Sequence, residues 1–363
     1  MPATAPGIHP KLDSYAMLPQ TSRRYDVENP EAARLLDQLL SQVNPSSERE
    51  WIREILVTAV KLVQDGAAAR DIKLLRTAVK EMRHAFRVFS QYRHVRKVSV
   101  FGSARTQPEE PDYQLAEELG RRLAAAGYMV ITGAGPGIME AAHRGAGTAC
   151  SIGLNIRLPF EQEANPVIAD DPKLINFRYF FTRKLFFVKE TDAIVLLPGG
   201  FGTMDEGFET LTLLQTGRSV PKPVVLLQGD PRPYWSTWLD FVRTCMLDRG
   251  LISPEDLALF RLARTAEEAC REIRTFYRRF HSLRYVEENR TLVIRLQRPL
   301  PPERIEELNR DFADILTAGS ITPTPPLEEE ANEPELEFLP RLKLSFDSYH
   351  FGRLRQLIDA INR

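Results

Sequence analysis

The feature that most restricts the fold is an alternation that begins near Lys97, where short apolar runs are separated by glycine-rich turns and amphipathic stretches. This order is typical of alternating β and α units whose strands form a parallel sheet. The expected strands are Val98–Phe101, Met129–Thr132, Ser151–Ile156, Ala193–Leu197 and Val224–Leu227, and the expected helices are Tyr113–Ala126, Ile138–Ala146, Phe180–Glu190, Thr203–Leu214 and Tyr234–Leu247. The sequence therefore predicts an α/β fold with a Rossmann-like, doubly wound parallel sheet.

The segments that flank this region follow different patterns. Before residue 96, apolar residues recur with helical spacing over Glu31–Leu40, Glu48–Val63 and Ile72–Phe89. After residue 282, we expect strands at Leu292–Arg295 and Leu342–Phe346, helices at Glu303–Leu316 and Gly352–Ile361, and a Pro- and Glu-rich linker at Thr322–Pro334. The predicted organisation is an N-terminal helical extension (1–95), a Rossmann-like central domain (96–282) and a small α+β C-terminal module (283–363).

Composition excludes several classes of function. The 48 Lys and Arg residues nearly balance the 49 Asp and Glu residues, so no global charge attracts nucleic acid or an anionic membrane. The three cysteines are odd in number and form no C-x-x-C pair, which argues against a disulfide framework and a structural zinc site. The chain shows no signal peptide and no run of eighteen apolar residues, and its cysteines form no disulfide framework, so we expect a reduced, cytoplasmic protein without a membrane span.

The strongest motif is Pro198-Gly-Gly-Phe-Gly-Thr-Met-Asp-Glu206, which follows an expected strand and opens an expected helix. Its glycines permit positive φ angles and let backbone amides approach a ligand, and a helix N-terminus attracts anions. We therefore expect a phosphate at Gly199, Gly200, Gly202 and Thr203. In the alternative interpretation, Thr203 and Glu206 form a capping box, and Glu206 only reaches back to the cap amide.

A second glycine-rich loop, Gly133-Ala-Gly-Pro-Gly137, also lies between a strand and a helix, with Pro136 expected as the first helical residue. Its spacing departs from G-x-G-x-x-G, and the next strand ends without an acidic residue for a ribose, so the loop does not indicate NAD. Gly133, Gly135, Gly137 and Met139 are candidate ligand contacts. Tight packing of a strand against a helix would also explain these glycines.

A third loop leaves the first strand and offers Gly102, Ser103 and Arg105 as candidate phosphate or base contacts, although an ordinary polar loop has the same composition. All three loops open at the carboxyl ends of parallel strands, where open α/β sheets bind ligands. The aromatic segment Asn176–Phe187 contains Arg183 and Lys184. Such a segment suits a core or a subunit interface as well as a base pocket, whereas Arg183 suits an anionic substrate.

These residues resemble the LOG (LONELY GUY) family of phosphoribohydrolases, formerly described as lysine decarboxylases. The family hallmark P-G-G-x-G-T-x-x-E is complete at Pro198–Glu206. The upstream element G-G-G-x-G-hydrophobic-Met is matched by Gly133–Met139 with Ala134 in place of a glycine, and the Arg-Lys pair is Arg183-Lys184. The resemblance covers about half of the chain, from Val98 to about Phe280.

The resemblance implies hydrolysis, without a metal or another cofactor, of the N-glycosidic bond of a purine nucleoside 5′-monophosphate, which gives a free base and ribose 5-phosphate. It places Arg183 and Glu206 in the catalytic positions and assigns Gly199, Gly200, Gly202 and Thr203 to phosphate binding. It also implies a homodimer or larger homo-oligomer with the active site near the subunit contact. The extra flanking segments and Ala134 leave the base open among adenine, an N6-modified adenine such as a cytokinin, and another base.

Three competing interpretations remain for this sequence. A non-catalytic protein that binds a nucleotide or carries a phosphorylated cofactor, such as a molybdenum cofactor carrier, needs the glycine loops but not the pair Arg183 and Glu206. A decarboxylase needs pyridoxal phosphate on a lysine, and nothing around Lys184 or Lys189 supports one. A DNA-processing protein needs a basic groove, whereas the basic cluster Arg83–Lys97 is typical of a solvated helix face.

Overall fold

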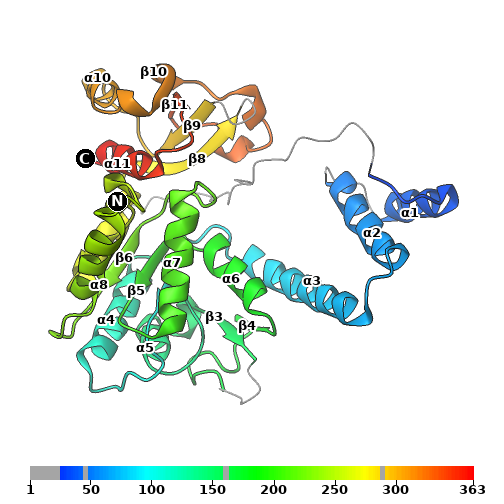
Figure 1. Cartoon of the computed structure of the whole chain (residues 1–363), viewed down its shortest axis with the longest axis horizontal. Coiled ribbons are helices and arrows are strands. Elements are labelled where there is room, and N and C mark those ends of the chain that lie inside the picture. The colour runs from blue at the N-terminus through cyan, green and yellow to red at the C-terminus, as the bar shows by residue number, and fades with distance from the viewer. Residues whose placement is uncertain (1–24, 44–47, 158–162, 287–290) are drawn as a thin grey trace, which may run out of the picture. The chain divides into compact units, whose positions relative to one another are not determined.

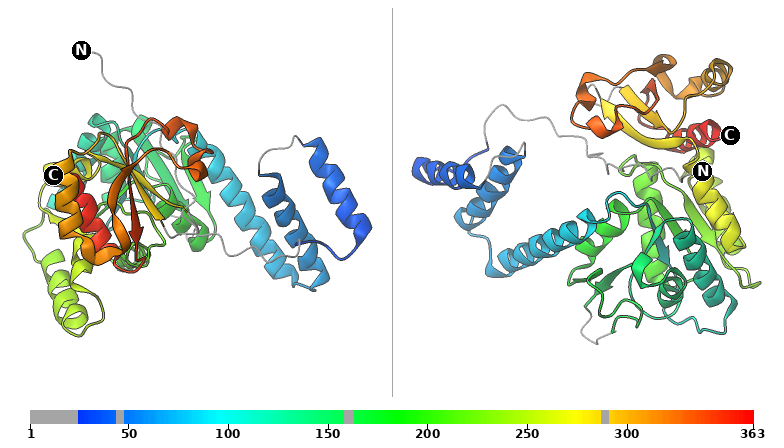
Figure 2. Two further views of the ribbon diagram at one scale, coloured as in Figure 1. Left: turned by 90° about the horizontal axis from the view of Figure 1, so that it is seen from above. Right: turned by 180° about the vertical axis from the view of Figure 1, so that it is seen from behind.

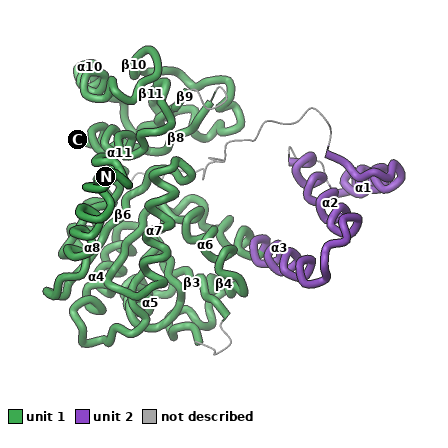
Figure 3. The backbone as a smooth tube through the Cα atoms, in the orientation of Figure 1, with its two compact units in different colours: residues 1–16, 84–363 green, residues 17–83 purple. Residues whose placement is uncertain are grey.

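The computed structural model describes residues 25–43, 48–157, 163–286 and 291–363, and these form two compact units (Figure 3). The unit drawn in purple, called the first unit here because it comes first in the chain, contains the described residues up to Arg83, and the unit drawn in green, the second, runs from His84 to Arg363. The first unit holds α1 (Pro30–Gln42), α2 (Arg49–Gln64) and the beginning of α3 (Ala69–Ser90). The predicted N-terminal helices are therefore confirmed, while residues 1–24 of the expected extension lie outside the described residues.

A seven-stranded sheet forms the centre of the second unit (Figure 1). Its strands, in spatial order, are β4 (Leu174–Phe177), β3 (Ser151–Ile156), β2 (Met129–Thr132), β1 (Lys97–Phe101), β5 (Ala193–Leu196), β6 (Val224–Leu227) and β7 (Arg261–Ala263). Every neighbouring pair is parallel. The predicted doubly wound fold is thus confirmed. The order reverses between β1 and β5, so a crevice opens at the carboxyl ends of these two strands.

Helices cover both faces of this sheet, as the views in Figure 2 show. On one face, α4 (Pro111–Ala125), α5 (Ile138–Ala146) and α9 (Ala266–Phe276) share a buried apolar cluster with the strands. On the other face lie α6 (Phe180–Lys189), α7 (Phe201–Gln215) and α8 (Trp235–Phe241). There, Phe187 of α6 contacts the ring of Phe101 at the end of β1. Burial of both helix layers fixes the directions in which the β–α loops open.

The C-terminal part is a four-stranded antiparallel sheet with two helices, which confirms the predicted α+β module. Its spatial order is β10 (Leu316–Thr324), β11 (Arg341–Phe346), β9 (Thr291–Leu296) and β8 (Phe280–Val286). The helices are α10 (Pro302–Asp311) and α11 (Phe351–Ile361), and their apolar faces complete a separate core with this sheet. Helix α11 also contacts the short 3-10 segment Pro254–Leu259 that precedes β7.

Several element predictions were wrong. The helix expected at Glu303–Leu316 ends at Asp311, and the linker expected from Thr322 begins inside β10, where Thr322 pairs with Lys343. The pattern was hidden because most residues of β10 are polar or small and exposed, with Ile321 the one fully buried residue of the strand. The helix expected at Tyr234–Leu247 is α8 followed by a π-helical turn from Val242. Strands β4, β7, β8 and β10 were not predicted.

Among the described residues, no helix combines the length and the apolar character that crossing a membrane requires.

Candidate functional site

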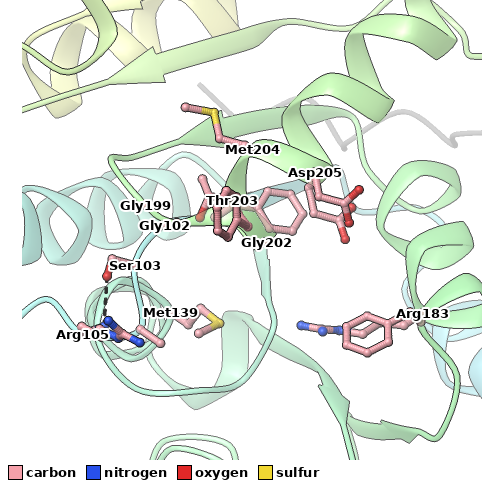
Figure 4. Close-up of a pocket in the computed structure, with 16 residues that line it drawn as sticks. Gly102, Ser103, Arg105, Met139, Arg183, Gly199, Gly202, Thr203, Met204 and Asp205 are labelled. Carbon is pink, nitrogen blue, oxygen red and sulfur yellow. Dashed lines mark hydrogen bonds between the residues drawn. The ribbon is translucent and has the colours of Figure 1, made fainter. Parts of the chain in front are cut away.

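A cavity of about 720 Å³ lies at the crevice between the ends of β1 and β5 (Figure 4). It is lined by residues of the loop after β1, of α5, of α6 and of the loop that enters α7: Phe101, Gly102, Ser103, Ala104, Arg105, Met139, Phe180, Arg183, Gly199, Gly200, Phe201, Gly202, Thr203, Met204, Asp205 and Glu206. The four segments singled out in the sequence, namely the three loop motifs and the aromatic segment, therefore meet at one place. The volume lies within the range of pockets that bind small molecules.

The N-terminus of α7 opens into this cavity. Gly200 is the N-cap, its carbonyl oxygen accepts hydrogen bonds from the amides of Thr203 and Met204, and the amides of Phe201 and Gly202 have no acceptor among the described residues. A Cβ atom at Gly200 or Gly202 would meet no protein atom within 4 Å, so both glycines face open space. Free amides beside open space at a helix N-terminus suit an anion such as phosphate.

Two expectations about this loop were wrong. Thr203 is the third residue of α7 and no side chain caps the helix, so Thr203 and Glu206 do not form a capping box. Gly199, Gly200 and Gly202 also lack positive φ angles. The requirement at Gly199 is space, because a Cβ atom there would lie 2.2 Å from the hydroxyl oxygen of Thr203.

The second glycine loop supports the cavity from behind. Gly137 has a φ of +68°, and a Cβ atom there would lie 2.4 Å from the carbonyl oxygen of Ser103. That oxygen accepts a hydrogen bond from the amide of Ile138 at 3.0 Å, and the amide of Ser103 donates to the carbonyl oxygen of Pro198 at 3.0 Å. The three loops thus form one connected set. Because α5 begins at Ile138, the expectation that Pro136 is the first helical residue was wrong.

Gly133 makes room for Arg183. A Cβ atom at Gly133 would lie 2.3 Å from Nη2 of Arg183 and 2.8 Å from Sδ of Met139. The Nε of Arg183 donates to the carbonyl oxygen of Leu154 at 2.8 Å, and the guanidinium carbon lies 5.2 Å from the centre of the Phe187 ring. Burial lowers the pKa of Arg183, which the charge of Glu206 partly offsets. Arg183 is therefore a fixed cation that reaches the cavity from the side opposite Ser103 (Figure 4).

The position at which the LOG motif has a glycine and this chain has Ala134 lies in the left-handed region. Ala134 has a φ of +61°, which an L-residue other than glycine adopts at a cost of about 1 kcal/mol. The buried Asn165 holds this loop: its amide donates to the carbonyl oxygen of Ala134 at 2.8 Å, and its side-chain nitrogen donates to that of Gly135 at 3.1 Å. These bonds compensate for the missing glycine and keep the loop in its left-handed turn.

Glu206 lies in a cluster of charges formed by α6 and α7. The Nζ of Lys184 lies 2.9 Å from Asp205, 2.6 Å from Glu209 and 3.9 Å from Glu206. Burial raises the pKa of Glu206 to about 7, although Lys184 and Arg183 act to lower it. Burial alone would lower the pKa of Lys184, but hydrogen bonds to Asp205 and Glu209 outweigh this effect and raise it. A carboxyl group with a pKa near 7 is suited to acid–base work at neutral pH.

The raised pKa of Glu206 predicts a pH-dependent cost to stability. In the unfolded chain Glu206 ionises near its ordinary value of 4.5, whereas in the folded protein it ionises near 7, so folding is disfavoured progressively between these values. We expect Glu206→Gln to stabilise the protein by up to about 3 kcal/mol more at pH 8 than at pH 4.5. Urea unfolding of both proteins across this range measures the difference; an equal effect at both pH values would contradict the raised pKa.

The structure places the predicted site residues in two groups. Ten line the cavity, namely Gly102, Ser103, Arg105, Met139, Arg183, Gly199, Gly200, Gly202, Thr203 and Glu206. Four do not: Gly133 and Gly137 support Arg183 and Ser103, Gly135 receives the bond from Asn165, and Lys184 lies among the carboxylates.

Sequence reasoning missed other residues at this site. Asp205, Phe180, Phe201 and Met204 line the cavity. All four stand inside the hallmark motif or the aromatic segment Asn176–Phe187, so the site residues next to them in the sequence are the signal that could have found them. The hydroxyl of Tyr234 donates to the carbonyl oxygen of Gly199, and no local pattern marks that residue or Asn165.

Across the described residues, no group of three or more His, Cys, Asp or Glu side chains is placed to hold a metal ion.

Comparison with known proteins finds a matching family model and similar curated proteins. Residues 137–273 match a family model described as "Possible lysine decarboxylase". A cytokinin riboside 5′-monophosphate phosphoribohydrolase of Arabidopsis thaliana, LOG3, is 29% identical over 192 residues, which are 50% of this chain and 83% of that protein. The cytokinin riboside 5′-monophosphate phosphoribohydrolase of Mycobacterium tuberculosis is 30% identical over 166 residues, 43% of this chain and 84% of that protein.

A solved structure of a molybdenum cofactor binding protein from Rippkaea orientalis superposes with a TM-score of 0.35 and 22% identity, over 50% of this chain and 95% of that one. The sequence relatives decide the family. With residues Gly199–Glu206 of the hallmark lining the cavity and the M. tuberculosis enzyme matched over most of its length, the chain belongs to the LOG family.

Proposed function

We propose that this protein hydrolyses the N-glycosidic bond of a purine nucleoside 5′-monophosphate and releases the free base and ribose 5-phosphate. One observation carries the proposal: the buried carboxyl group of Glu206 and the guanidinium of Arg183 line the same cavity as the open N-terminus of α7. A protein that only carries a phosphorylated ligand needs the helix N-terminus but no carboxylate beside it. The names of the relatives also describe them as phosphoribohydrolases.

The phosphate is expected at the free amides of Phe201 and Gly202, where the helix dipole and the absence of side chains at Gly200 and Gly202 favour an anion. This position directs the ribose toward Glu206, one turn further along α7. As the bond to the base breaks, the sugar gains oxocarbenium character, and the Glu206 carboxylate stabilises that charge and orients the attacking water. Arg183 stabilises negative charge on the phosphate or on the departing base.

The walls of the cavity suit a flat, apolar base. Met139, Phe180 and Met204 line it and provide surface against which a purine can stack. At the cavity mouth, Phe201 is 96% exposed and Phe180 is 56% exposed. Large exposed aromatic side chains at this density are typical of a binding surface, so we expect a homo-oligomer whose subunit contact lies beside the cavity. The balanced charge disfavours nucleic acid as a partner, and the cysteine usage favours a cytoplasmic enzyme.

The test is to incubate the purified protein with AMP and, separately, with N6-isopentenyl-AMP, and to follow the release of base by chromatography. We expect base and ribose 5-phosphate in equal amounts, and the ratio of the two rates identifies the preferred purine. Pyrimidine monophosphates serve as the comparison set. If no nucleotide releases its base while calorimetry still detects nucleotide binding, the protein is a nucleotide or cofactor carrier instead.

A further inference from the structure

Lys184 is not placed to bind the substrate phosphate. It follows Arg183 in the motif, which favours an anion-binding role, yet it is absent from the cavity lining. Its ammonium group contacts Asp205 at 2.9 Å and Glu209 at 2.6 Å, so two carboxylates already neutralise it. A cation that is paired twice has little charge left for a substrate phosphate.

The third neighbour of this ammonium group is Glu206. The distance of 3.9 Å from Nζ to Oε1 of Glu206 is too long for a hydrogen bond but short for two charges in a site that is largely removed from water. The Glu206 side chain is 12% exposed and that of Lys184 is 16% exposed. Lys184 therefore influences Glu206 through its charge, while Asp205 and Glu209 hold it back from direct contact.

We propose that Lys184 is a positioning residue that acts on the substrate only through Glu206, and that Glu209 shares its charge and so limits that action. This inference rests on the proposed function of Glu206. The charged groups that face Glu206 are Lys184 and Arg183 from α6 and Asp205 and Glu209 from α7. Lys184 favours the ionised form of Glu206 and Glu209 disfavours it, so the two residues set the pH at which Glu206 becomes a carboxylate.

The two variants Lys184→Met and Glu209→Gln are expected to have opposite effects. Loss of the cation leaves three carboxyl groups together, so Glu206 ionises at a higher pH and the acid limb of the pH–rate profile rises by about one pH unit. Loss of the Glu209 charge removes a repulsion and releases Lys184 toward Glu206, so the acid limb moves to lower pH. Lys184→Arg keeps the cation and is expected to leave the limb in place.

A second readout does not depend on catalysis. The stability difference between each protein and its Glu206→Gln derivative, measured by urea unfolding from pH 4.5 to 9, titrates Glu206 directly. The pH at which this stability difference reaches half of its full size is expected to rise in the Lys184→Met background and to fall in the Glu209→Gln background. Lys189→Met is the matched control, because Lys189 lies on the same helix, pairs with Glu190 at 2.7 Å and does not line the cavity.

The alternative role gives a different result. If Lys184 binds the phosphate, Lys184→Met raises KM for AMP and weakens the binding of ribose 5-phosphate in calorimetry by tenfold or more. In that case the acid limb of the pH–rate profile and the midpoint of the stability difference do not move. That outcome overturns the inference. Shifted stability midpoints in a protein that releases no base would retain the electrostatic role of Lys184 and reject the proposed enzymatic function, so the two failures are distinguishable.

Discussion

Glu206→Gln lowers kcat for base release from a nucleoside 5′-monophosphate by about 10³-fold, which is the largest effect on activity that the structure predicts. The amide keeps the size and the hydrogen-bonding capacity of the side chain but carries no negative charge for the developing oxocarbenium ion. Glu206 is not part of the proposed phosphate site at the free amides of the α7 N-terminus. We therefore expect KM and the affinity for ribose 5-phosphate to change less than threefold.

The control for this experiment is Glu117→Gln, the same chemical change on the surface of α4 outside the cavity. Its kcat is expected to equal that of the unchanged protein. The pH dependence gives a further check: since Glu206 acts as a carboxylate, the rate should rise with pH through a value near 7. A Glu206→Gln protein that retains a tenth or more of the activity would show that another group stabilises the sugar.

Gly137→Ala is predicted to have the largest effect on the architecture of the site. Two penalties combine at this position, because φ is +68° and the new methyl group would lie 2.4 Å from the carbonyl oxygen of Ser103 and 2.7 Å from the carbonyl carbon of Ala104. Backbone atoms cannot yield as a flexible side chain does. We expect a loss of about 2–6 kcal/mol in the free energy of unfolding, the sum of backbone strain and overpacking.

Gly147 at the other end of α5 provides a matched control. It has a similar φ of +73°, but a Cβ atom there would meet nothing within 4 Å. Gly147→Ala thus reports the cost of the backbone conformation alone, about 1–3 kcal/mol. The difference between the two variants in urea unfolding measures the contact between the two loops. Equal losses would mean that the loop after β1 moves away freely, and the affinity for ribose 5-phosphate should then fall only in Gly137→Ala.

Much of the central domain could be predicted from its sequence because buried parallel strands read as short apolar runs. Each of the runs ending at Phe101, Thr132, Ile156 and Leu227 proved to be a strand with nearly the expected bounds. The edge strand β7 has only three residues, one of them the polar Arg261, so it carries no such signal. Strand β10 was not predicted for a related reason. It is a strand because it pairs with β11, and its own sequence has no apolar pattern.

The candidate site was predictable to the extent that its residues belong to local motifs. Glycines in a strand–loop–helix sequence indicate that something comes close to the backbone, but they do not say what. Gly200 faces open space, Gly137 packs against the loop after β1, and Gly133 packs against the guanidinium of Arg183. Tertiary contacts of this kind join residues far apart in the chain. The sequence for that reason gave no hint that Lys184 lies among carboxylates rather than beside the ligand.

The contact between Gly133 and Arg183 has a consequence for how such sites diverge. The two residues are fifty positions apart and belong to different βα units, yet Nη2 of the arginine occupies the space that any side chain at position 133 would need. A larger residue at 133 therefore requires the guanidinium of Arg183 to shift or a shorter residue to stand at 183. Across homologous sequences, a residue larger than glycine at position 133 should accompany a shorter residue at position 183.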